Sequence, residues 1–100
     1  MMVHAVYFWL KDELTDQQRQ RFEEHLNALI KIPHVKRGHV GRPAGTEQRE
    51  VVDHSFSFAL VLEFADVDAH DAYQEHPTHH RFTYECKTHW RKLMIYDSAS

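Results

Sequence analysis

The segment Val3–Leu10 is apolar on both faces that a β-strand would present, and this limits the possible folds most strongly. Side chains alternate across a strand, so the residues divide into two sets. One face carries His4, Val6, Phe8 and Leu10, and the other carries Val3, Ala5, Tyr7 and Trp9. A strand of this kind is covered on both sides. The 100 residues form one domain, residues 1–100, with helices for only one face, so we expect a homodimer in which a second copy covers the other face.

Hydrophobic spacing and capping signals predict the remaining elements. Thr15 followed by Gln18 is a capping-box signature that opens a helix, and Pro33 prevents its continuation. Residues 34–40 form a second strand, and the polar residues 42–53 form a long loop. Asp66 caps a short helix, residues 78–88 form another helical piece, residues 90–96 form the last strand, and Asp97 begins a frayed tail.

The segment 54–64 has the clearest alternation of the chain. One face carries Phe56, Phe58, Leu60, Leu62 and Phe64, and we expect these large side chains to meet the helices. The resulting order of elements is β-α-β-β-α-β, which is typical of ferredoxin-like folds. The sequence therefore predicts the α+β class, with a four-stranded antiparallel sheet and helices on one face.

Composition and charge exclude several classes of partner. The net charge is −3, from 12 basic and 15 acidic side chains, and no basic stripe is interleaved with aromatic residues, so a nucleic acid is not expected. No run of about 18 apolar residues is present, so no membrane span is expected. The first residues lack the features of a signal peptide, and Cys86 has no cysteine partner. These features predict a cytoplasmic protein.

One tyrosine and three imidazoles lie close together in residues 72–80, with Pro77 among them. Imidazole exchanges a proton near neutral pH, so Tyr73 and His79 beside a proline corner are candidates for acid–base chemistry. His4 interrupts the apolar first strand. If the fold brings His4 beside Tyr73 and His79, the three form the polar end of a small-molecule pocket. The expected apolar wall residues are Phe22, Leu26, Phe58 and Leu60.

These residues resemble the stress-responsive dimeric α/β-barrel family. The matching features are His4 in the first strand, Phe22 in the first helix, the run from Tyr73 to His79 with its Tyr-x-x-His-Pro-x-His motif, and Asp97 after the last strand. The resemblance covers about residues 3–97 and implies two ferredoxin-like sheets packed back to back as a barrel between subunits. It also implies that His79, Tyr73 and His4 match the residues with which one member closes a linear polyketide.

We therefore expect a homodimeric barrel protein with a small apolar pocket in each subunit. The pocket would take a small apolar or carbonyl ligand, with His79 as the base and Tyr73 orienting the substrate or stabilising an enolate. One alternative is a non-catalytic assembly protein, and another is a cofactor-independent or haem-linked monooxygenase. No cofactor is expected. No metal site is expected either, because Pro77 interrupts the His76–His79 spacing, which also lacks the glutamate of His-Glu-x-x-His.

Overall fold

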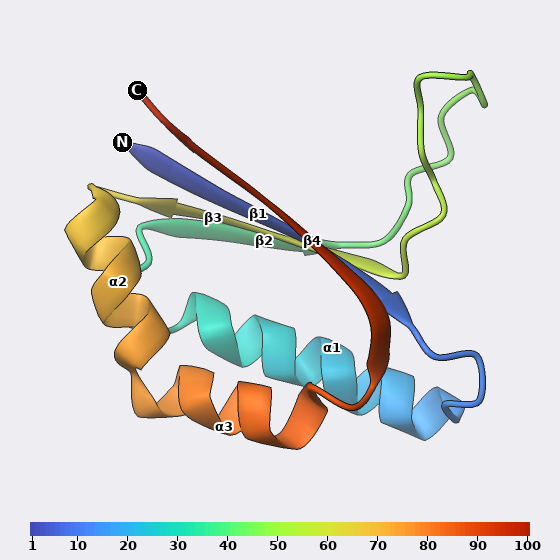
Figure 1. The fold of residues 1–100 in the computed structure, drawn as a ribbon, viewed down its shortest axis with the longest axis horizontal. Helices are drawn as coiled ribbons and strands as arrows, with labels where there is room; N and C mark the ends of the chain where they lie inside the picture. Colours follow the sequence, from blue (N-terminus) through green and yellow to red (C-terminus); the bar gives the residue numbers. More distant parts are fainter.

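The strands of the computed structural model, which describes residues 1–100, form one antiparallel sheet in the order β2-β3-β1-β4. Their bounds are Met2–Leu10 (β1), Arg37–Gly41 (β2), Phe58–Phe64 (β3) and Trp90–Ala99 (β4). Three helices lie on one face of the sheet: Asp16–Ile30 (α1), Val67–Glu75 (α2) and Pro77–Cys86 (α3) (Figure 1). None of them has both the length and the apolar character needed to cross a membrane. The predicted ferredoxin-like α+β fold is confirmed.

Side-chain caps fix where the helices begin. Thr15 Oγ1 accepts the Gln18 backbone N–H at 3.1 Å, and Gln18 Oε1 accepts the Thr15 N–H at 2.8 Å, so the predicted capping box is present. Asp66 caps α2 by accepting the Ala69 N–H at 2.8 Å. His76 caps α3 through its Nδ1 atom. Each cap satisfies a backbone donor that has no partner within its helix.

The core lies between the sheet and the helices, and aromatic rings occupy its centre. Phe8 of β1 contacts Phe22 of α1, Phe82 of α3 and Trp90 of β4, with ring centroids 5.1, 6.0 and 5.4 Å apart. Pairs of this kind contribute about 0.5–1.5 kcal/mol each beyond their buried area. The cluster therefore holds α1 and α3 against the same central strand that carries His4.

The strand predicted for residues 54–64 begins only at Phe58, and the predicted position of Phe56 is wrong. Ser57 donates its N–H to Phe8 at 2.7 Å, and its hydroxyl accepts the Leu10 N–H at 2.9 Å. These two bonds replace regular pairing, and the alternation of β3 does not continue through them. Phe56 consequently packs against Tyr7 on the face away from the helices, with ring centroids 5.1 Å apart.

Two further boundaries differ from the prediction. The second strand begins at Arg37 rather than His34, because a turn in which Val35 donates to Ile32 at 2.9 Å precedes it. The residues after Tyr96 are not a frayed tail, since β4 continues to Ala99. The end of β4 pairs with the first residues of the chain: Met2 pairs with Ala99, and Ser100 donates its N–H to the Met1 carbonyl at 2.9 Å.

The face of the sheet away from the helices keeps apolar side chains that no helix covers. The loop between β2 and β3 projects to this side (Figure 1). At one end of the face, Trp9 is buried, donates to Ser55 Oγ at 2.9 Å, and lies under Lys92. Elsewhere the face is open: Tyr7 is half-buried and Tyr96 is 59% exposed. The helices thus bury only one of the two apolar faces of β1, as the sequence predicts.

Helix α1 packs tightly against the sheet at Gly38, which suggests a test of this packing. A Cβ atom at Gly38 would lie 2.7 and 2.8 Å from Ile30 Cγ1 and Cγ2, and 3.0 Å from Leu62 Cδ2. Because this crowding forces the helix or its side chains to shift, Gly38→Val should lower the free energy of unfolding by about 1–3 kcal/mol in urea denaturation. Gly45→Val is the matched control, since a Cβ there meets nothing within 4 Å. Equal effects of the two substitutions would contradict the close approach.

Candidate functional site

A cavity of about 210 Å³ lies between the sheet and the helices, and most of its wall is apolar. The apolar residues that line it are Val6, Phe8, Leu29, Leu60, Phe82, Trp90, Leu93 and Ile95. Its polar residues are His4, Tyr73, Gln74, His79 and Thr83. An apolar wall with a few polar groups is the usual composition of a small-molecule site. Ile95 on the edge strand β4 is 47% exposed, so the cavity opens to solvent beside this strand.

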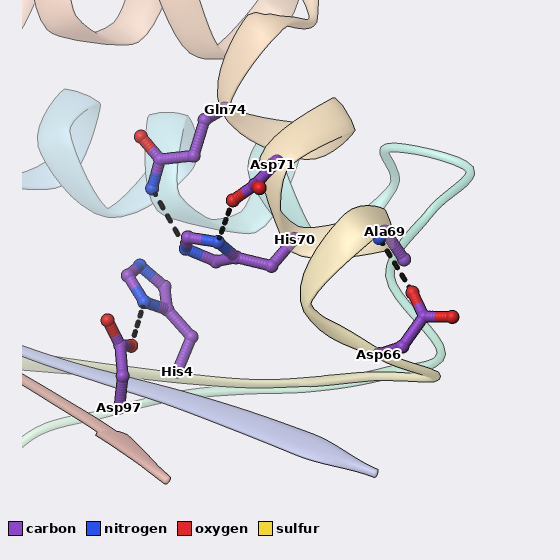
Figure 2. Close-up of polar contacts among 7 residues, drawn as sticks. All are labelled: His4, Asp66, Ala69, His70, Asp71, Gln74 and Asp97. Carbon is purple, nitrogen blue, oxygen red and sulfur yellow. Dashed lines mark hydrogen bonds and ion pairs between the residues drawn. The ribbon is translucent and has the colours of Figure 1, made fainter. Parts of the chain in front are cut away.

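Strand alternation places His4 on the inner face of β1, directly opposite Asp97 of β4. His4 is only 3% exposed, and its Nδ1 lies 2.6 Å from Asp97 Oδ1 (Figure 2). Burial lowers the pKa of His4 below 6.5, although the neighbouring carboxylate opposes the shift. His4 is therefore neutral at pH 7, with Nδ1–H donating to Asp97 and a lone pair on Nε2.

The corner between α2 and α3 brings Tyr73 and His79 together. His76 caps α3 and Pro77 is its first residue, so α3 begins immediately after α2 ends. Tyr73 in the last turn of α2 then faces His79 in the first turn of α3, with ring centroids 4.9 Å apart. The Tyr73 ring is also 6.2 Å from that of His4. The three residues predicted from the sequence as a polar cluster thus lie in one row along the cavity.

Burial sets the protonation of Tyr73 and His79. It raises the pKa of the Tyr73 hydroxyl well above its ordinary value of 10, so the hydroxyl stays protonated and can donate. It lowers the pKa of His79 below 6.5; neighbouring imidazoles lower it further, and Glu75 opposes the shift. Neither side chain forms a hydrogen bond within the chain. A neutral imidazole and a phenol are therefore both free to bond with a molecule in the cavity.

The observed wall differs in part from the predicted one. Leu60 lines the cavity, whereas Phe22, Leu26 and Phe58 are buried in the core and form no part of its wall. The reason is the position of the cavity along α1: it meets the last turn, at Leu29, rather than the middle of the helix. A larger groove of about 680 Å³ between α1 and α3 reaches Phe22, but polar side chains line most of it. None of the predicted polar residues His4, Tyr73 and His79 lines this groove.

His70 was not among the residues predicted from the sequence, although its ring lies 4.7 Å from that of His4. Its Nδ1 is 3.1 Å from Asp71 Oδ1, and its Nε2 is 3.2 Å from Gln74 Nε2 (Figure 2). The signal that could have found it is spacing, because residues three apart share a helix face and His70 precedes Tyr73 by three. The Asp97 carboxylate, predicted from the sequence to begin a frayed tail, is the partner of His4.

The lowered pKa of His79 leads to a pH-dependent stability. The unfolded chain protonates this residue near pH 6.5, whereas the folded chain keeps it neutral to lower pH, so the folded state binds fewer protons. The free energy of unfolding should therefore fall as the pH is lowered from about 7.5 to about 5.5. The free energy of unfolding of His79→Gln should fall by less over the same range. Urea denaturation at several pH values measures both. If wild type and variant lost the same stability, burial of a neutral His79 would be disproved.

Comparison with known proteins identifies the family of this chain. Residues 2–100 match the family described as Stress responsive A/B Barrel Domain. Olivetolic acid cyclase from Cannabis sativa is 26% identical over 95 residues, which cover 94% of this chain and 91% of the cyclase.

Two solved structures show the same fold. A dimeric ferredoxin-like protein of unknown function from Thermobifida fusca superposes with a TM-score of 0.81 at 23% identity, covering 99% of this chain and 90% of the other. A hydroxynitrile lyase from Passiflora edulis superposes with a TM-score of 0.81 at 20% identity, and the match covers 97% of this chain and 90% of the lyase. With nearly the whole chain matched and the resemblance seen in its motif confirmed, the protein belongs to the stress responsive A/B barrel domain family.

Proposed function

We propose that the cavity binds a small carbonyl compound and that His79 and Tyr73 act on it by acid–base chemistry. The observation that carries the proposal is the meeting of His4, Tyr73 and His79 at the polar end of an otherwise apolar cavity. The volume of about 210 Å³ lies below the roughly 300–1,000 Å³ of most ligand pockets, which favours a small compound.

In this proposal each residue has a separate role. His79, as a neutral imidazole, takes the proton from the carbon next to the carbonyl, and the electron pair of the broken C–H bond forms the enolate. The Tyr73 hydroxyl donates a hydrogen bond to the enolate oxygen. His4, held by Asp97, presents Nε2 at the same end of the cavity and can accept a hydrogen bond from a substrate hydroxyl. Return of the proton from His79 to product completes the cycle.

Two observations favour an enzyme over a purely structural protein. A structural role predicts that the three polar residues bond only to each other or to the backbone, without a cavity between them. Instead Tyr73 and His79 line a cavity, and their polar atoms form no hydrogen bond within the chain. In addition, two similar proteins carry the names of enzymes of small organic compounds, a cyclase and a lyase.

We also propose that the chain forms a homodimer through the uncovered face of the sheet. The support is the apolar character of that face and the description of a structural neighbour as dimeric. Two sheets packed back to back would bury Val61 and Tyr7 and would complete a barrel. Each subunit would keep its own cavity, because the cavity lies on the helical side of the sheet.

The dimer can be tested at Val61, which lies in the middle of the uncovered face opposite Ala5 of β1. Val61→Glu should convert a dimer into a monomer in sedimentation equilibrium at micromolar concentration, because a buried unpaired carboxylate is costly. Gln20→Glu adds the same charge on exposed α1 and should leave the dimer intact. If Val61→Glu unfolds the protein, Tyr96→Glu at the exposed edge of the face replaces it. A monomeric wild type would contradict the proposal.

The acid–base role can be tested without knowing the substrate, by following exchange of α-protons for deuterium in a panel of small alkyl and aryl ketones by NMR. Wild type should accelerate exchange for at least one ketone, and His79→Gln should slow it by about 10²–10⁴-fold. The matched control is His80→Gln, since His80 is the adjacent imidazole and is 62% exposed. Exchange that is equally fast in His79→Gln and wild type would rule out His79 as the base.

A further inference from the structure

A second group of polar side chains gathers around His4 of the cavity wall and includes one residue, His70, that the proposed chemistry does not use. His4 of β1, His70 of α2 and Asp97 of β4 each offer one donor atom, and these atoms all lie within 4.8 Å of one another (Figure 2). We propose that these three residues bind one divalent transition-metal ion of the zinc class. This site does not depend on the proposed acid–base reaction.

The chemistry of the three donors selects the class of ion. Imidazole nitrogen suits zinc, cobalt, nickel and copper, whereas magnesium and calcium prefer sites built of oxygen alone. Two imidazoles with one carboxylate are a donor set that zinc uses when it keeps a further position open for water or another ligand. The carboxylate also supplies a negative charge, which offsets part of the charge of a dication beside the buried His4 ring.

The surroundings of His70 leave one of its nitrogens ready to bind. Asp71 is a hydrogen-bond acceptor 3.1 Å from Nδ1, so the ring proton lies on Nδ1. The Gln74 amide nitrogen, which can only donate, lies 3.2 Å from Nε2, so Nε2 carries the lone pair. A carboxylate that accepts a hydrogen bond from the ring nitrogen not bound to the metal usually orients a metal-binding histidine and strengthens its binding. The Gln74 side chain would turn away when the ion binds.

Binding of the ion through His4 Nδ1 and Asp97 Oδ1 requires a modest adjustment of these two side chains. Tetrahedral ligands about 2.1 Å from an ion lie about 3.4 Å apart, so the 2.6 Å contact of His4 Nδ1 with Asp97 Oδ1 must open by about 0.8 Å. The ring proton of His4 moves from Nδ1 to Nε2, which is the other ordinary neutral tautomer. The Asp97 side chain is 45% exposed at the edge of the sheet, which gives it room to move and gives the ion a route of entry.

Surface histidines bind zinc weakly, so the test compares matched histidine variants of the full chain. The probe is Zn²⁺ in isothermal titration calorimetry, with Co²⁺ absorption reporting the ligand geometry. Wild type should bind one Zn²⁺ per chain, and His70→Ala should weaken this binding at least about 10-fold. His80→Ala removes an exposed imidazole outside the cluster and should bind as wild type does.

Asp97→Asn gives a second measurement, because the amide keeps a hydrogen-bonding group opposite His4 but lacks the negative charge. Zn²⁺ should bind more weakly to this variant than to wild type. Circular dichroism confirms that each variant is folded. The proposal is overturned if wild type binds no Zn²⁺, or if His70→Ala and Asp97→Asn bind it as tightly as His80→Ala does. Because the readout is binding rather than turnover, failure of the metal site leaves the acid–base proposal standing, and the converse also holds.

Discussion

Burial of the central strand β1 is the constraint on which the rest of the structure depends. It pairs with β3 on one side and β4 on the other, so every other element is placed relative to it. Its inner face supplies Phe8 to the aromatic core and His4 to the cavity, so stability and the candidate site share one strand. The helices cover this inner face only. The apolar outer face is therefore what leads us to propose a second subunit, and the cavity lies on the opposite side from that contact.

The buried imidazole of His4 in the candidate site depends on Asp97, a residue near the end of β4. A buried polar group without a hydrogen-bond partner is costly, and Asp97 supplies the partner only because β4 extends past Tyr96. Without a metal ion the same carboxylate fixes the tautomer of His4. In the proposed metal site it instead completes the donor set with His70, and the His4 ring proton moves to Nε2. A single residue near the end of the chain thus supports the protonation state that the acid–base proposal uses and the charge that the metal proposal uses.

Local patterns predicted the fold well and part of the lining of the candidate cavity. Alternation and capping signals identified the strands and helices, because both arise from residues close together in the sequence. Phe56 was misplaced because two hydrogen bonds of Ser57 to β1 interrupt the alternation, and such long-range bonds leave no local pattern. His4, Tyr73 and His79 were found because the proline corner and the polar break in an apolar strand are local signals. Leu29 was missed because its role depends on where α1 crosses the sheet. The helical spacing of His70 and Tyr73 is a local signal, but it does not show that the fold places His70 beside His4.

The pairing of β1 with β4 also places the two ends of the chain side by side (Figure 1). The Ser100 backbone bonds directly to Met1, at the same end of the sheet as the His4–Asp97 pair. A short linker would therefore join the ends without disturbing a strand, and the loop between β2 and β3 offers a place to open new ones. Such a circular permutant would keep every strand pairing of the sheet while moving the free ends, and any fusion partner attached to them, away from the cavity entrance.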